Sequence, residues 1–170
     1  MAATPFTIPA TLHPALPFAP GAAREYLRSQ EDFIALVGAD PSLVTTRELP
    51  DPLERPVVTI QAGLNHRENI LAHKVRLMIS VWVPPIEILV DGDPPTPKDP
   101  EELAWDIASL SGQLLDMRRY MGQGPSFQYR GATWRGTWDD GPVTLVDTDR
   151  GPNHPIYRAV IQVVMTLGSN

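Results

Sequence analysis

Residues 72–83 read Ala-His-Lys-Val-Arg-Leu-Met-Ile-Ser-Val-Trp-Val, a segment that alternates between two kinds of side chain. His73 and the aliphatic residues from Val75 to Val83 share one face. The other face carries Lys74, Arg76, Met78, Ser80 and Trp82. A repeat of two is the geometry of a β-strand, because successive side chains point to opposite sides of the sheet. We therefore predict a long strand with one face in the core and a partly polar face that meets water or another subunit.

The next element outward is a helix, predicted from Pro100 to Met121. Pro84-Pro85 ends the strand, and the proline-rich segment Pro84–Asp99 predicts a loop. Asp99 can cap the helix, Pro100 suits its first position, and Gly122 ends it. Apolar residues recur at steps of three and four: Leu103, Ile107, Leu110, Leu114, Met117 and Met121. A strand followed by a helix, with no reactive group at the junction, is typical of a scaffold.

The flanking segments predict further helix and strand. Hydrophobic spacing predicts one helix from Ala22 to Val37, ended by Gly38, and strands at 43–49 and 56–62. The last third predicts a strand or hairpin at 127–138, a short strand at 143–146 and a long final strand at 157–167. Val160 and Val164 make the second face of the final strand partly apolar, which favours a central strand or one covered on both faces.

The order of these elements predicts an α/β (α+β) domain, in which a mostly antiparallel or mixed β-sheet has two main helices packed against it. We assign residues 22–170 to this single domain and residues 1–21 to a proline-rich N-terminal arm. The chain has 19 prolines, and those from Pro5 to Pro20 lie in the arm among apolar residues such as Phe6 and Phe18. The arm either packs on its own domain or extends onto a neighbouring subunit.

Charge and composition limit the classes of partner. The formal net charge is −6 over 170 residues. This argues against a protein that mainly grips nucleic acid, because phosphate contacts need clustered Lys and Arg. It is compatible with a protein that lets DNA pass without adhering. The chain has no cysteine, which excludes disulfides and cysteine-based metal or redox sites. We expect no signal peptide and no membrane helix, because the N-terminus lacks a basic and apolar leader and the apolar runs are short.

Catalytic motifs are absent from the sequence. It contains no G-x-S-x-G elbow and no glycine-rich phosphate loop. The best metal-binding candidates are His66, Glu68 and His73, with a polar loop and a strand-end histidine as the competing interpretation. Asp91-Gly92-Asp93 and the acidic pair Asp147 and Asp149 are weaker candidates, for which solvated loop acids are the simpler interpretation. We therefore predict neither an enzyme nor a bound cofactor.

Aromatic and arginine side chains alternate between Tyr129 and Trp138, as they do on surfaces that stack nucleic-acid bases. Asp139 and Asp140 follow at once, and the net charge is negative. Both facts favour sheet packing or a protein interface, where aromatic residues are enriched. The interface candidates are Trp82, Trp134, Trp138, Arg118, Arg119, Phe6 and Phe18.

The layout over residues 22–168 resembles the tail terminator family of long-tailed bacteriophages, also called tail-completion or tail-to-head joining proteins. The resemblance rests on four segments: the helix Glu25–Val37, the strand Val75–Val83 ending in Trp82-Val83-Pro84, the helix opening Asp99-Pro100-Glu101-Glu102-Leu103-Ala104, and the strand Tyr157–Leu167. The arm and the loop 84–99 are additions to that pattern.

The resemblance implies a non-catalytic virion protein. Such a protein forms a ring, typically of six subunits, at the head-proximal end of the tail tube, where it stops tube polymerisation and presents a surface to the neck. Its partners would be further copies of itself, the tail tube protein and a neck protein, with DNA passing through the lumen. The alternatives are another ring of the same assembly, either a tube subunit or a neck adaptor, and a small metal-dependent enzyme that uses His66, Glu68 and His73. A module with general affinity for DNA is a further alternative.

Overall fold

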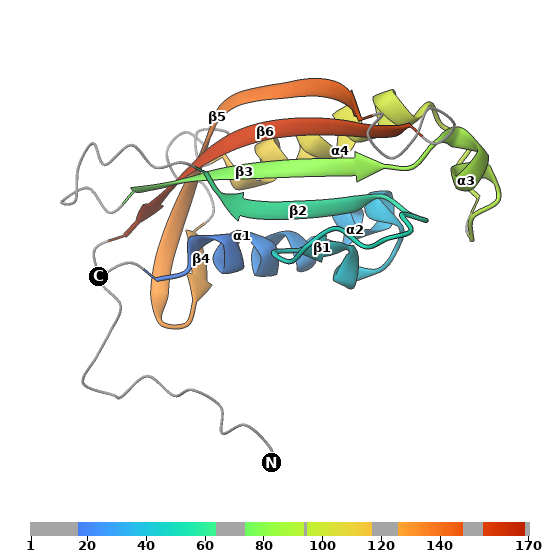
Figure 1. Cartoon of the computed structure of the whole chain (residues 1–170). Coiled ribbons are helices and arrows are strands. Elements are labelled where there is room, and N and C mark those ends of the chain that lie inside the picture. Colours follow the sequence, from blue (N-terminus) through green and yellow to red (C-terminus); the bar gives the residue numbers. More distant parts are fainter. Residues whose placement is uncertain (1–16, 64–73, 94, 117–125, 148–154, 169–170) are drawn as a thin grey trace, which may run out of the picture.

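The computed structural model describes residues 17–63, 74–93, 95–116, 126–147 and 155–168. They form a curled six-stranded sheet in the order β1-β2-β3-β6-β5-β4, with helices packed against it (Figure 1). The strands are β1 (Val44–Thr45), β2 (Val57–Ala62), β3 (Lys74–Val83), β4 (Ser126–Tyr129), β5 (Ala132–Asp147) and β6 (Ile156–Leu167). Only β1 and β2 pair in parallel, and the other neighbours are antiparallel. The predicted fold class, a mixed sheet with packed helices, is confirmed.

Strand β3 lies at the centre of the sheet, between β2 and β6. Its side chains from Val75 to Val83 on the predicted core face are all buried, whereas Lys74 and Arg76 on the other face are exposed. The core face of β6 continues this row through Ala159, Ile161, Val163 and Met165, all fully buried. The central position predicted for the final strand is therefore confirmed. His73 lies outside the described residues.

Helix α4 (Pro100–Leu115) begins as predicted. The Asp99 carboxylate accepts hydrogen bonds from the backbone N–H groups of Glu101 and Glu102, both at 3.0 Å, which is the geometry of an N-cap. The helix is predicted to continue to Met121, and this prediction is wrong at Asp116, where α4 has already ended. Asp116 has extended backbone angles and forms a parallel bridge with Gly136 of β5. The chain therefore leaves the helix there to meet the sheet.

The single helix predicted at 22–37 is two helices, α1 (Ala19–Arg28) and α2 (Glu31–Val37). They are separated at Ser29 and Gln30, where the Ser29 hydroxyl donates to the carbonyl of Tyr26 at 2.6 Å and Gln30 is extended. The bend lets both short helices bury an apolar face. Helix α1 starts before residue 22, inside the predicted arm, and its first residues are buried, so the arm is shorter than predicted.

Two other segments differ from the predictions. The loop predicted at 84–99 contains a short helix, α3 (Ile86–Val90), which starts directly after Pro85. The separate strands predicted at 127–138 and 143–146 are a hairpin of β4 with one long strand, β5, which continues to Asp147 through two register shifts. The strand predicted at 43–49 shrinks to β1 and follows a 3₁₀ turn, η1 (Pro41–Leu43).

The main helices lie on one face of the sheet, where α4 contacts β3, β5 and β6 and α1 contacts β2 and β4 (Figure 1). The buried core lies between these two layers. No helix in the described part of the chain is long and apolar enough to cross a membrane. The opposite face of β2, β3, β5 and β6 carries none of these helices, and we call it the open face.

Candidate functional site

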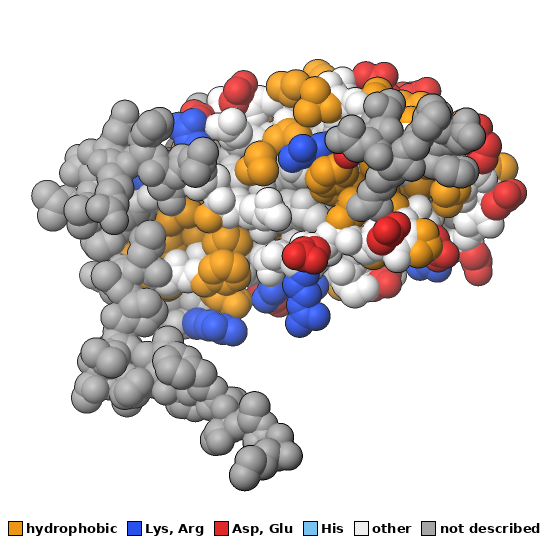
Figure 2. All heavy atoms as spheres, viewed as in Figure 1, with side chains coloured by type: hydrophobic (Ala, Val, Ile, Leu, Met, Phe, Trp, Pro, Cys, Tyr) orange, Lys and Arg blue, Asp and Glu red, His pale blue; other side chains and the backbone are white. Residues whose placement is uncertain are grey.

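The open face is built by cross-strand rows of side chains that the strand register aligns. One row joins Trp82, Arg158 and Leu145, and the next joins Ser80, Val160 and Val143. A third row joins Met78, Gln162 and Asp140. Most of these side chains are partly or fully accessible, in contrast to the buried rows on the helix side. Figure 2 looks onto this face and shows hydrophobic side chains gathered between scattered charged ones.

Arg158 is the charged residue at the centre of the open face. Its guanidinium stacks on the Trp82 ring, 4.5 Å from the ring centroid, and its Nη2 donates to the Ser80 hydroxyl at 2.9 Å. Its Nε is buried and has no hydrogen-bond acceptor within the described residues. Burial lowers the pKa of Arg158, although the nearby Asp147 carboxylate opposes this shift. The guanidinium stays charged, because its pKa is ordinarily far above neutral pH.

Trp82, on which the Arg158 guanidinium stacks, is itself held in place by residues of β2. Its indole N–H donates to the Thr59 hydroxyl at 3.0 Å, which fixes the ring orientation. The ring also packs against a small buried cluster of Leu53, Val57 and Ile156. Trp82 therefore supports Arg158 as a flat platform, and its own surface is only partly accessible.

A shallow hollow of about 270 Å³ lies on the open face beside Arg158. Apolar side chains from three strands line it: Met78 of β3, Val160 of β6, and Val143 and Leu145 of β5. Gln162 and Asp140 also line it. The hollow is wide and open, so it suits a segment of chain lying across the sheet better than a small molecule enclosed on all sides.

In the part of the chain that the structure describes, the second half of β5 is a free edge. Strand β4 pairs with β5 only as far as Arg135. Beyond Arg135, no strand in the described part of the chain pairs with the outer edge of β5, apart from the bridge of Gly136 with Asp116. Val143, Leu145 and Val146 on this edge are 53%, 50% and 52% exposed. Exposed apolar residues on an unpaired edge mark a contact surface, because such an edge can template pairing with another chain.

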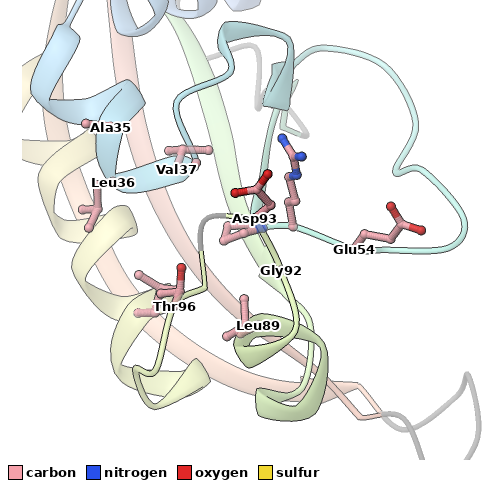
Figure 3. A pocket seen from close by; sticks show the side chains of 12 residues that line it. Ala35, Leu36, Val37, Glu54, Leu89, Gly92, Asp93 and Thr96 are labelled. Carbon is pink, nitrogen blue, oxygen red and sulfur yellow. The ribbon is translucent and has the colours of Figure 1, made fainter.

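A second cavity lies between α2, α3 and the segment before β2 (Figure 3). It measures about 60 Å³ and has aliphatic walls that include Val37, Leu89 and Leu103, with Glu54 and Asp93 also among its lining residues. This volume is far below the roughly 300 Å³ at which small-molecule sites begin. The cavity is therefore smaller than a typical small-molecule site.

The predicted interface tryptophans have separate positions. Trp82 lies on the open face, as described above. Trp134 is fully buried in the core, so its side chain offers no surface to a partner, and the interface role predicted for it is wrong. Trp138 is half-buried on the helix side, where its ring packs against Gly112 of α4 and its indole N–H donates to the Asp140 carbonyl at 3.2 Å.

Of the other predicted interface residues, the structure describes only Phe18. Phe18 precedes α1 and is 52% exposed. Phe6, Arg118 and Arg119 lie outside the described residues, as do the metal-site candidates His66, Glu68 and His73. No group of three or more metal-ligating side chains occurs among the residues that are described.

Sequence reasoning missed the residues that dominate the open face, namely Arg158, Val143 and Leu145. The signal for Val143 and Leu145 was present, since both lie in a short apolar run that also exposes Val146. The sequence pattern does not show which strands lie beside this run, and the neighbouring strands decide whether it is central or at an edge of the sheet.

Neither a protein-family model nor a curated protein matches this chain.

Proposed function

We propose that the chain is a structural virion protein of the tail terminator type. Six copies form a ring at the head-proximal end of the tail tube, and the ring stops tube polymerisation and receives the neck. The activity consists of binding only, without a catalytic step or a cofactor. DNA passes through the lumen without specific contacts, in keeping with the net charge of −6.

The free edge of β5 is the observation that supports this proposal most strongly. A ring needs two different surfaces on each subunit that fit each other, because identical surfaces meeting each other close into a dimer instead. The β5 edge, with Val146 and its neighbours half-exposed, supplies one surface that no strand among the described residues covers. A β-sheet with helices packed against it is also the architecture that the resemblance in sequence layout implies.

The decisive experiment is a tube-length assay. Purified protein is mixed with a tail tube protein that is actively polymerising, and tube lengths are measured by electron microscopy. We expect the protein to cap the tubes and shorten them in proportion to its concentration, with a six-fold ring visible at one end.

The same assay separates this proposal from its rivals. A tube subunit would extend or join the tubes, whereas a neck adaptor would leave their lengths unchanged. Either result would overturn the proposed terminator function.

A further inference from the structure

The side chains that line the hollow on the open face indicate which kind of chain segment would bind there. Its walls, Met78, Val143, Leu145 and Val160, are apolar. Its charged groups, Arg158 and Asp140, have opposite signs, so the hollow has little net charge. A strongly acidic or a strongly basic partner would therefore gain little there from long-range attraction. An uncharged apolar segment fits the charge of the hollow best.

Arg158 adds a requirement for hydrogen-bond acceptors. The guanidinium has five N–H donors. Among the described residues it donates one hydrogen bond, to Ser80, and its Nε has no acceptor. The Nε is too buried to be reached by a partner, but Arg158 as a whole is only partly buried. A docked segment rich in unpaired backbone carbonyls can therefore accept hydrogen bonds from the Nη groups of the guanidinium.

The N-terminal arm of the chain has this chemistry. No Asp, Glu, Lys or Arg occurs before Arg24. The segment 1–16 interleaves Pro5, Pro9 and Pro14 with apolar residues such as Ile8 and Leu12. Prolines lack an N–H, and proline-rich chain in the polyproline II form has no internal hydrogen bonds, so its carbonyls remain available as acceptors. Proline-rich segments commonly bind in apolar grooves that provide a few donors.

The arm is also long enough. Sixteen residues precede Pro17, the first described residue. At about 3.1 Å per residue in the polyproline II form they span roughly 50 Å. A folded chain of this size has a radius of gyration of only about 15 Å. An arm extended in this way is therefore long enough to reach the hollow from the start of α1, on its own domain or on an adjacent copy.

We propose that the proline-rich arm, residues 1–16, is the occupant of the hollow on the open face. It lies across β5 and β6 with its apolar side chains against Val143, Leu145 and Val160, and its carbonyls accept hydrogen bonds from Arg158. This inference does not depend on the terminator function, since an arm docked in this way would serve any assembly of the chain.

Cysteine cross-linking of the full-length protein tests the proposal, because the chain has no cysteine of its own. Ala10→Cys in the arm is combined with Val143→Cys in the hollow. The matched control combines Ala10→Cys with Val90→Cys on α3, a valine of similar exposure, 46% against 53%. With a short bismaleimide, we expect at least about fivefold more cross-link at Val143, because docking raises the local concentration of the arm there.

A second comparison tests the role of Arg158. Arg158→Gln should lower the cross-link between positions 10 and 143 severalfold, whereas Arg135→Gln, an exposed arginine on the same face, should leave it unchanged. Circular dichroism checks folding, and Leu145→Cys replaces Val143→Cys if the latter does not fold.

Two results would overturn the proposal. One is an equal cross-link yield at Val143 and Val90. The other is efficient dimer formation by Val143→Cys without the arm cysteine, which would mean that a second copy covers the face directly. Either result leaves the tube-length assay unaffected, so this inference and the proposed function fail separately.

Discussion

At the scale of single residues, Gly112 shows how the position of a helix depends on one missing side chain. A Cβ built on Gly112 would lie 2.6 Å from the nearest atom of the Trp138 ring. In an exposed helix, alanine is favoured over glycine by about 1 kcal/mol. Here the close contact outweighs that preference, because neither the ring nor α4 can move without disturbing the core.

We predict that Gly112→Ala lowers the free energy of unfolding by about 1–3 kcal/mol, the usual cost of overpacking. Urea unfolding followed by circular dichroism measures this. Gln113→Ala, the exposed neighbour, is the control and should stay within about 0.5 kcal/mol of the parent. A stabilised Gly112→Ala protein would mean that Trp138 does not pack against α4 as described.

Substitution of Trp134 tests whether this residue stabilises the core or contacts another subunit. Its ring is fully buried, and its indole N–H has no acceptor within the described residues. We predict that Trp134→Ala costs about 3–5 kcal/mol, as is typical for truncation of a buried aromatic residue. Trp134→Phe should cost far less, because it removes an unpaired donor and keeps most of the apolar contact. If Trp134→Ala changed assembly but left thermal stability intact, Trp134 would be an interface residue after all.

At the scale of elements, α4 depends on its cap. Asp99 accepts two backbone N–H groups that the first turn would otherwise leave without partners. We predict that Asp99→Ala lowers the free energy of unfolding by about 1 kcal/mol. The control, Asp93→Ala, removes an exposed loop aspartate close in sequence and should have little effect. Equal losses in urea unfolding for the two variants would show that general charge, not the cap, causes the change.

At the scale of the whole molecule, the free edge of β5 is expected to control assembly. Val146 is 52% exposed, and by register it faces away from the hollow. We predict that Val146→Asp abolishes ring formation in analytical ultracentrifugation and leaves the unfolding free energy nearly unchanged, because little apolar area is buried there in the monomer. Val90→Asp on α3 is the matched control and should assemble normally. Normal rings from Val146→Asp would exclude the β5 edge from the subunit contact.

The sequence by itself determined the elements whose signals are local. The period of two in β3 agrees with the burial of every second side chain from Val75 to Val83, because alternation is a property of the strand alone. The start of α4 at Pro100 agrees, because a cap is made by adjacent residues. The mixed α and β class followed from these elements.

Only the tertiary structure decided what depends on contacts between distant segments. Helix α4 ends at Leu115 because Asp116 meets Gly136, 20 positions later in the chain. Trp134 became a core residue and Arg158 a partly buried residue of the open face through the register of β5 against β6. Within the described residues, the outer edge of β5 beside Val143 has no strand partner because the pairing with β4 stops at Arg135. Strand order and register are non-local, so no pattern within one segment encodes which surfaces remain uncovered for a partner.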